Sequence, residues 1–477
     1  MGDPAHKLHR LFYPRAVAVV GAKRVNNYSW LRNHINFSGP KYHVNTDESE
    51  WPGAEELGYQ NFRSVRDIPG PVDYVTITVP NTVVPYVMQD CAAKGVTGVH
   101  IFATGFAEIH TDEGIRLEES VKQIAQEGNI QVLGPNCMGI FHPKVGIRQN
   151  QAQDYGFSGF LGYISQSGTG AIAFSHAARA AGIAISKSVS FGNGAVVDCT
   201  DILEYLGQDD ETQMIAMYLE GVRDGRRFFE TLREAARRKP VLVWKVGQTE
   251  DGARAGLAHT GSIPIATSLW DAILRQCGAI TVDSMDELLD TGRALLSLSK
   301  PVESGALITV SGGHSGQIAD AFGRYFRVPA LAPVSMDEIA SYSDLRGGSF
   351  ANPFEGPSVR GEDVLARTLG VLQRDPNIDF IVQEIAPAAM QRDPAALARR
   401  IETLQSVVGQ DAKPLFVLLA TDSSYTENPD LGAIAREFIA GGIPCLLGME
   451  RTARALRRAA DYYRRRAPDT TPRSDGT

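Results

Sequence analysis

The stretch LGYISQSGTGAIAFSHAARAA, from Leu161 to Ala181, decides the fold class of this chain. An apolar run predicts a strand over Leu161–Ser165, and an alanine-rich run predicts a helix over Ala171–Ala181. Between them lies a turn of small and polar residues, Gln166 to Gly170. A strand, a short turn and a helix in this order are typical of the βαβ units that build parallel sheets, so the chain is predicted to be α/β.

A second stretch of the same kind, ALITVSGGHSGQIADAFGRY, runs from Ala306 to Tyr325. It repeats the order of apolar strand, turn rich in serine and glycine, and helix. This internal similarity predicts two flavodoxin-like domains in tandem. Their later strands are expected over the apolar runs Ser186–Phe191, Met214–Leu219 and Val241–Val246, and over Phe380–Glu384, Pro414–Ala420 and Pro444–Leu447.

The chain before Leu161 alternates short apolar runs with amphipathic ones, which predicts an N-terminal Rossmann-like domain. Several domains are expected, because 477 residues exceed the size of one hydrophobic core. The polar stretch from His142 to Gly159 shows neither period and predicts a linker. The expected strands of this domain are Ala16–Val20, Tyr74–Val79, Gly98–Phe102 and Gln131–Leu133. The predicted division is a Rossmann-like domain over 1–148, flavodoxin-like domains over 155–300 and 301–465, and a disordered tail over 466–477.

The composition restricts the kinds of partner. With 47 basic and 55 acidic residues the formal net charge is −8, which argues against a nucleic-acid partner. The five cysteines are widely spaced and form no C-x-x-C pair, a pattern typical of a reducing compartment. No apolar run approaches the ~18 residues that cross a bilayer. We therefore expect a cytoplasmic protein with no membrane partner and no metal site of its own.

The predicted carboxyl ends of the first domain's strands carry candidate ligand-binding residues. Ligands of an open α/β sheet bind outside those ends, so the turns there should converge on one crevice. Gly21 alone is equally well explained as the glycine of a tight turn, and the other two glycines of a dinucleotide fingerprint are missing. A nicotinamide-dependent dehydrogenase is therefore the weaker hypothesis. The residues that we expect to bind a nucleotide-like cofactor are Gly21, Ala22, Lys23, Pro80, Thr104 and Asn136.

The second domain contains the sharpest candidate for a reactive residue, His259, in a loop of small residues, Ala255–Ile263. Imidazole nitrogen is nucleophilic near neutral pH, and small neighbours let a phosphate group approach it. The turn Ser167-Gly168-Thr169 opens a helix, whose N–H groups and dipole favour a negative phosphoryl group. Glu220 follows a predicted strand and could orient the imidazole. Taken singly, His259 and Glu220 are better explained as a structural or exposed histidine and as a solvated glutamate at a strand end.

Together these residues resemble the nucleoside-diphosphate-forming acyl-CoA synthetases, the superfamily that includes succinyl-CoA synthetase and the ADP-forming acetyl-CoA synthetases. The resemblance covers nearly the whole chain and is specific because the motifs keep their order and spacing. The motifs are Val19-Val20-Gly21-Ala22, Lys94-Gly95-Val96, Thr104-Gly105-Phe106-Ala107-Glu108, Gly134-Pro135-Asn136-Cys137-Met138-Gly139, Ser165-Gln166-Ser167-Gly168-Thr169, Tyr218-Leu219-Glu220-Gly221 and His259-Thr260-Gly261.

The resemblance implies an acid-thiol ligase in which the first domain binds coenzyme A and His259 carries a phosphoryl group. It further implies that the turn at Ser167 holds phosphate and that Glu220 steadies the histidine. In this family an ATP-grasp domain binds ATP or GTP with Mg²⁺, and the sequence shows no such pattern. The resemblance therefore implies an α-type subunit in a hetero-oligomer with a separate ATP-grasp subunit, acting on a small carboxylic acid.

Two departures from the family pattern support an alternative. The third domain's opening turn has His314-Ser315 where proline and a small residue are expected, and the first turn carries the bulky run Lys23–Trp30 where relatives are glycine-rich. The alternative hypothesis is a non-catalytic protein that binds CoA or acyl-CoA and keeps the fold.

Overall fold

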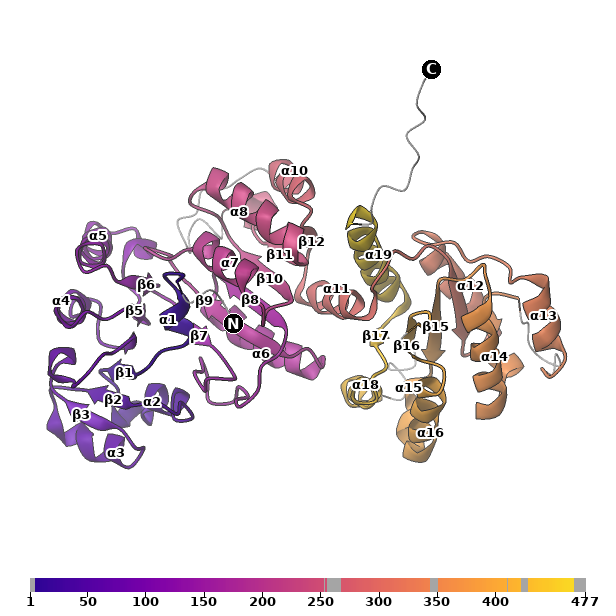
Figure 1. Ribbon diagram of the computed structural model, residues 1–477, viewed down its shortest axis with the longest axis horizontal. Coiled ribbons are helices and arrows are strands. Elements are labelled where there is room, and N and C mark those ends of the chain that lie inside the picture. Colours follow the sequence, from indigo (N-terminus) through magenta and orange to yellow (C-terminus); the bar gives the residue numbers. More distant parts are fainter. Residues whose placement is uncertain are drawn as a thin grey trace, which may run out of the picture. The chain divides into compact units, whose positions relative to one another are not determined.

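The computed structural model of the chain describes residues 5–252, 254, 267–343, 351–409, 411–421 and 428–466. These residues form two compact units (Figure 1). The first contains the described residues of 5–179 and 183–285, and the second those of 180–182 and 286–466. Within the described part of the chain, none of the helices combines the length and the apolar character that crossing a bilayer requires.

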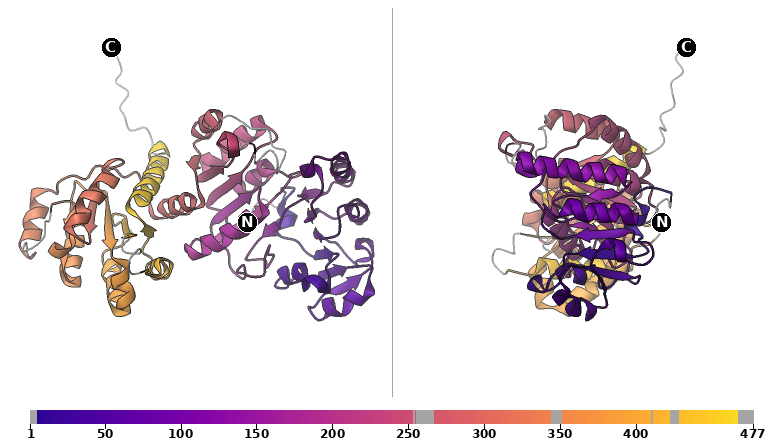
Figure 2. Two further views of the ribbon diagram at one scale, coloured as in Figure 1. Left: turned by 180° about the vertical axis from the view of Figure 1, so that it is seen from behind. Right: turned by 90° about the vertical axis from the view of Figure 1, so that its left-hand side faces the viewer.

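The first unit begins with a six-stranded parallel sheet in the order β3-β2-β1-β4-β5-β6. This is the strand order of the Rossmann fold, so the Rossmann-like prediction is confirmed. The short strands β2 and β3 are additions to the four that the sequence predicts. In Figure 2 the packed pair α4 (Val84–Lys94) and α5 (Asp112–Glu127) is seen as two neighbouring purple helices. The strands are β1 (Val17–Val20), β2 (Lys41–Val44), β3 (Gln60–Phe62), β4 (Tyr74–Ile77), β5 (Gly98–Ile101) and β6 (Gln131–Leu133).

The second sheet of this unit has the order β12-β11-β10-β8-β9-β7. Its five parallel strands have the flavodoxin-like order, so the predicted flavodoxin-like fold is confirmed. The sixth strand, β7 (Gly139–Phe141), runs antiparallel to β9, so a strand within the predicted first domain joins the second sheet. The other strands are β8 (Leu161–Ser165), β9 (Ile185–Ser190), β10 (Met214–Leu219), β11 (Val241–Lys245) and β12 (Ile280–Val282). The helices are α6 (Gly168–Ala180), α7 (Cys199–Gln208), α8 (Gly225–Arg238) and α10 (Thr267–Cys277).

The second unit contains one five-stranded parallel sheet in the order β14-β13-β15-β16-β17. This order is again flavodoxin-like, and it confirms the predicted repetition of the fold. The strands are β13 (Gly305–Thr309), β14 (Phe354–Glu355), β15 (Phe380–Ile385), β16 (Leu415–Leu419) and β17 (Cys445–Leu447). The helices are α11 (Met285–Ser297), α12 (Gly312–Gly323), α13 (Pro333–Ala340), α14 (Glu362–Arg374), α15 (Pro387–Arg392), α16 (Pro394–Gln405), α18 (Leu431–Ala440) and α19 (Met449–Arg466).

The basic C-terminal helix α19 forms ion pairs with α11. Arg451 contacts Asp290 at 2.9 Å, and both Arg454 and Arg458 contact Glu287 at 2.9 Å. Several basic side chains of the last helix therefore form ion pairs within the second unit.

The first two predicted domains share a hydrophobic core, which explains why they form one unit. Leu11 and Phe12 of the short helix α1 (His9–Phe12) are buried together with second-sheet residues such as Ile164. The ring of Phe12 stacks on Tyr205 of α7, with centroids 4.6 Å apart and planes 4° from parallel. The N-terminal segment therefore fixes the Rossmann-like sheet to the second sheet.

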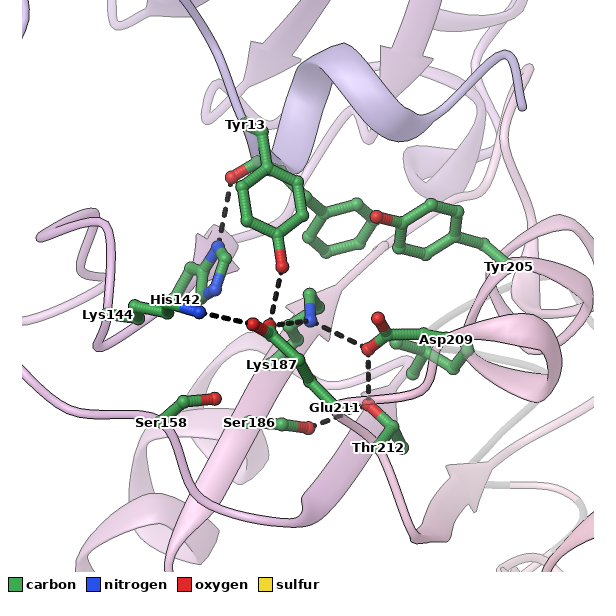
Figure 3. A network of polar contacts seen from close by, with 12 residues as sticks. Tyr13, His142, Lys144, Ser158, Ser186, Lys187, Tyr205, Asp209, Glu211 and Thr212 are labelled. Carbon is green, nitrogen blue, oxygen red and sulfur yellow. Dashed lines mark hydrogen bonds and ion pairs between the residues drawn. The ribbon is translucent and has the colours of Figure 1, made fainter. Parts of the chain in front are cut away.

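A buried ionic network reinforces this junction (Figure 3). The Lys187 side chain is completely buried, and its ammonium contacts Asp209 at 2.7 Å and Glu211 at 2.9 Å. Glu211 also accepts hydrogen bonds from Tyr13 and Lys144. Burial alone would raise the pKa of Glu211, but the hydrogen bonds from Lys144, Tyr13 and Lys187 outweigh it and hold that pKa well below its ordinary value. Through Tyr13, the network connects the N-terminal segment to Lys187 of β9 and to Glu211, which precedes β10.

Candidate active site

The turn after β1 depends on a glycine and on inward packing of bulky residues. Gly21 has a φ of +86°, and a β carbon there would lie 2.6 Å from Cγ1 of Val79. The carbonyl of Ala22 accepts hydrogen bonds, while Lys23 is exposed. Tyr28 and Trp30, from the bulky run noted in the sequence, are each 5% exposed. They therefore pack beneath the turn.

The turns after β4, β5 and β6 are joined to each other at the carboxyl edge of the first sheet. Asn81, which follows Pro80, donates from Nδ2 to the carbonyl of Gly105, which follows Thr104, at 2.8 Å. The backbone N–H of Asn136 donates to the carbonyl of Ala103 at 3.0 Å, with Asn136 in the left-handed region at a φ of +60°. The structure thus places the predicted residues Pro80, Thr104 and Asn136 on neighbouring turns.

The predicted phosphate-binding turn lies at the start of α6. Ser167 caps the helix, because its Oγ accepts the N–H of Gly170 at 3.1 Å. Gly168 and Thr169 begin the first helical turn, whose backbone N–H groups are of the kind that can hold an anion. The position of this turn is fixed by Ser165, the last residue of β8, whose Oγ donates to the carbonyl of Ser167 at 2.8 Å.

The turn that contains Asn136 lies against this helix start. A β carbon on Gly168 would be 3.0 Å from Cγ of Met138, and the N–H of Met138 donates to Ser190 Oγ at 3.1 Å. A β carbon on Gly192 would be 2.3 Å from the carbonyl oxygen of Asn136. Glycines therefore allow the first sheet to approach the second closely. As a result, the turn of Asn136, a predicted cofactor-binding residue, lies next to the predicted phosphate-binding turn at Ser167.

Glu220 lies just beyond β10, and an unpredicted residue positions its backbone. The amide oxygen of Gln166 accepts the N–H of Glu220 at 3.0 Å and that of Gly221 at 3.2 Å. Burial lowers the pKa of Lys245 on β11, while the negative charge of Glu220 opposes that shift. His259 lies outside the described residues, so its pairing with Glu220 stays a prediction. The signal for Gln166 in the sequence is its place beside Ser167 in the Ser-Gln-Ser-Gly motif.

A cleft of about 480 Å³ opens beside these turns, between the two sheets of the first unit. Asn193 holds its two walls together: its Nδ2 donates to Glu108 at 2.6 Å and to Glu118 at 2.9 Å. Arg223 donates to the carbonyls of Asn193 and Ala195. Of this set, the sequence analysis contains only Glu108, within a motif; Glu118, Asn193 and Arg223 were missed, because they are distant in the chain and meet only through the fold. The lining includes Glu108, His110, Ile115, Glu118, Gln166, Phe191, Asn193, Asp198, Val222 and Arg223.

Comparison with known proteins decides the family. Residues 15–143 match a family described as a CoA binding domain, and residues 158–295 match a succinyl-CoA ligase like flavodoxin domain. The chain is 33% identical over 384 residues to the acetate–CoA ligase (ADP-forming) II subunit alpha of Pyrococcus furiosus, across 79% of this chain and 81% of that protein. The chain belongs to the ADP-forming acid–CoA ligase family. The resemblance drawn from the motifs is confirmed.

Two further comparisons describe this ligase-family chain. It is 35% identical over 416 residues to the acetate–CoA ligase (ADP-forming) I of Archaeoglobus fulgidus. The matched region covers 86% of this chain but only 58% of that longer relative. The solved dinucleotide forming acetyl-coenzyme A synthetase 1 of Ca. Korarchaeum cryptofilum, in complex with phosphate and ADP, is 28% identical, with a TM-score of 0.82. That match covers 96% of this ligase-family chain and 97% of the solved one, so the fold is shared over nearly its whole length.

Proposed function

We propose that this chain is the CoA-binding, phosphohistidine-carrying α-type subunit of an acid–CoA ligase. The complete enzyme would interconvert a carboxylate, CoA and ATP or GTP with acyl-CoA, the nucleoside diphosphate and phosphate. One observation carries the proposal: the Asn136–Met138 turn of the first sheet lies directly against the start of α6, because Gly168 lets the Met138 side chain approach the helix N-terminus. A thioester and a phosphate can meet at this junction.

The chemistry assigned to this chain needs only acyl-CoA and inorganic phosphate. An oxygen of phosphate attacks the thioester carbonyl, the C–S bond breaks, and CoA leaves as the thiol with the proton from phosphate. A ring nitrogen of His259 then attacks the phosphorus of the acyl phosphate, the bond from phosphorus to the acyl oxygen breaks, and the acid leaves as its carboxylate. The N-terminus of α6 stabilises the phosphate oxygens by its N–H groups and dipole.

The remaining residues position these groups. Gln166 fixes the backbone at Glu220, and the Glu220 carboxylate accepts the second imidazole N–H of His259. The turn residues Gly21, Ala22, Lys23, Pro80 and Thr104 bind the nucleotide portion of CoA. Asn136 lies at the junction with the phosphate site, where the thioester end of CoA is required.

The nucleotide half of the reaction is assigned to a separate ATP-grasp subunit, which supplies ATP or GTP with its Mg²⁺. Support comes from the Pyrococcus furiosus relative, which is named a subunit alpha and of which this chain covers 81%. Within the described part of this chain, His, Cys, Asp and Glu side chains form no group of three that could hold a metal ion. The proposed assembly is a hetero-oligomer.

The half-reaction gives a direct test without the partner. The chain is incubated with acyl-CoA and radiolabelled phosphate, and acid-labile, base-stable label on protein is measured together with released thiol. We expect labelling in the parent chain and none in His259→Ala. The matched control is His176→Ala, because His176 is an exposed histidine of α6. Equal labelling of His259→Ala would contradict the proposal, and CoA binding by calorimetry without any labelling would favour the non-catalytic alternative.

A further inference from the structure

A second cleft lies in the second unit, at the carboxyl end of its sheet. It measures about 290 Å³, and the ends of β13 and β15 line it, with Thr309 and Ile385 among the lining residues. These two strands are neighbours, whereas β14, which comes between them in the sequence, lies on the other side of β13. The strand order therefore reverses between β13 and β15, and open α/β sheets bind ligands at such a point.

Several polar side chains of this cleft are already engaged with other groups of the protein. Arg400 donates three hydrogen bonds to the Glu362 carboxylate. One oxygen of Glu384 accepts the N–H of Val310, and the other contacts His314. These groups form part of the wall, so a ligand has to be recognised by other side chains.

Gln383 and Arg360 are the polar side chains of the lining that can recognise a ligand. Gln383 is 4% exposed, and its Oε1 has no hydrogen-bond partner among the described residues. Arg360 is exposed and forms no ion pair within the described part of the chain. An unpaired buried amide oxygen costs free energy, which a donor on a ligand would offset. The terminal torsion of a glutamine is soft, so rotation of the amide can turn this oxygen toward the cleft.

The apolar part of the lining suits a flat ring. Ile308 and Ile385 are buried, and Met390 of α15 is partly buried against the same hydrophobic core. A methionine thioether is flexible and makes favourable contacts with aromatic rings. If each heavy atom takes about as much space as a water molecule, ~30 Å³, the cleft holds about ten of them. This is the size of a purine base.

A glutamine amide discriminates between purines. Its oxygen can accept from the 6-amino group of adenine while its nitrogen donates to N7, which is a recognised pairing for this base. Guanine and hypoxanthine carry an oxygen at position 6, so they would leave the amide oxygen of Gln383 without a donor. Arg360 can pair with a phosphate group that lies outside the space occupied by the base.

We propose that the cleft of the second unit binds an adenine nucleotide, with the base on Gln383 and the phosphate on Arg360. The site is separate from the phosphate-binding turn at Ser167. The inference goes beyond the proposed function and does not depend on it.

Titration of the full chain with AMP, IMP and adenosine, followed by calorimetry, tests the class of ligand. We expect AMP to bind about tenfold or more tightly than IMP, which is the scale of discrimination by one bidentate contact to a base. Adenosine should bind more weakly than AMP, because it carries no charge for Arg360. Equal affinities for AMP and IMP, or no binding of AMP, would overturn the inference.

Variants locate the bound nucleotide. Gln383→Leu should weaken AMP binding about tenfold or more. Arg360→Gln should weaken AMP binding about threefold and leave the affinity for adenosine unchanged, because only AMP carries the phosphate. The matched controls are Gln317→Leu and Arg327→Gln, which change exposed residues of the second unit outside the lining and should bind AMP as the parent chain does.

Two outcomes separate this inference from the proposed function. Parental AMP affinity in a folded Gln383→Leu variant would place the nucleotide elsewhere, for example on the turns of the first sheet, and would overturn the inference. Protein labelling from acyl-CoA and phosphate is a separate measurement on the same chains. Its absence in the parent chain would contradict the proposed function and leave the nucleotide site standing.

Discussion

The turn after β8 in the first unit and the turn after β13 in the second are built on the same frame. β8 ends at Ser165 and β13 at Thr309, and each strand leads to a serine before its helix, Ser167 or Ser311. In both turns the hydroxyl of the strand's last residue donates to the carbonyl of that serine, at 2.8 Å in the first and 3.0 Å in the second. The internal repeat seen in the sequence therefore extends to individual hydrogen bonds.

The two turns differ at the third helical position. In α6 this is Gly170, whose N–H donates to Ser167 Oγ at 3.1 Å. In α12 it is His314, whose Nδ1 lies 2.9 Å from Oε1 of the buried Glu384, and the other oxygen of Glu384 accepts the N–H of Val310 at 3.0 Å. The shared frame determines the fold, whereas this position determines what the turn can bind. An anion is favoured beside small residues at a helix N-terminus and disfavoured beside a buried carboxylate.

The largest expected effect comes from giving the first turn the side chain of the second. In Gly170→His the new β carbon would lie 3.1 Å from Oγ of Ser167, and the ring would occupy space needed by phosphate. We expect the rate of protein labelling from acyl-CoA and phosphate to fall about 100-fold or more, as when an oxyanion loses a donor. The reciprocal variant His314→Gly is the control and should label close to the parental rate. Parental labelling by a folded Gly170→His variant would contradict the comparison.

The next effect concerns Gln166, whose side chain joins the turn after β8 to the backbone that follows β10. Gln166→Leu removes the acceptor for the N–H groups of Glu220 and Gly221, so the free energy of unfolding should fall by about 1–3 kcal/mol in urea titrations. The labelling rate should fall about tenfold or more, because the backbone at Glu220 loses its position. Gln166→Glu keeps an acceptor and should lose less of both. Unchanged stability and labelling in Gln166→Leu would show that this amide positions nothing.

Much of the fold was predictable because it depends on local pattern. Buried strands such as β8 and β10 are continuous apolar runs, and the glycine and serine turns mark where each helix begins. The strands β2, β3, β7, β12 and β14 were missed because runs of two to four residues are too short to show a period. The stretch from His142 to Gly159 was predicted to be a linker because it is polar. His142 is nevertheless buried, and its position is set by a hydrogen bond to the backbone of Phe12, which hydropathy does not report.

The site was predictable only where motifs carry it. The ordered motifs led to Ser167 and Asn136, which the structure brings to one junction. Asn193 and Arg223 were missed, because their contacts with Glu118 form only when the two sheets pack together. Pattern along a chain reports the turns of a sheet, whereas the walls of a cleft between two sheets depend on tertiary structure.

A smaller effect is expected from the ion pair that distinguishes the second turn. His314→Ala leaves the Glu384 carboxylate with one donor fewer, and we expect the second unit to lose about 1 kcal/mol of stability, since the imidazole is partly exposed. Urea unfolding of His314→Ala, Glu384→Gln and the double variant would measure the coupling of the pair. Strictly additive effects would contradict a direct interaction.

The smallest effect is expected from Gln383→Leu, which makes in the second unit the substitution that Gln166→Leu makes in the first. Gln383 on β15 is 4% exposed, and its Oε1 has no hydrogen-bond partner among the described residues. Leucine has a similar size and removes a buried polar group, so Gln383→Leu should leave the free energy of unfolding unchanged or raise it by up to about 1 kcal/mol. Urea titration beside Gln166→Leu makes the same substitution in both units. A loss as large as that of Gln166→Leu would mean that Gln383 supports its turn as Gln166 does, and the difference between the two turns would then be confined to His314 and Glu384.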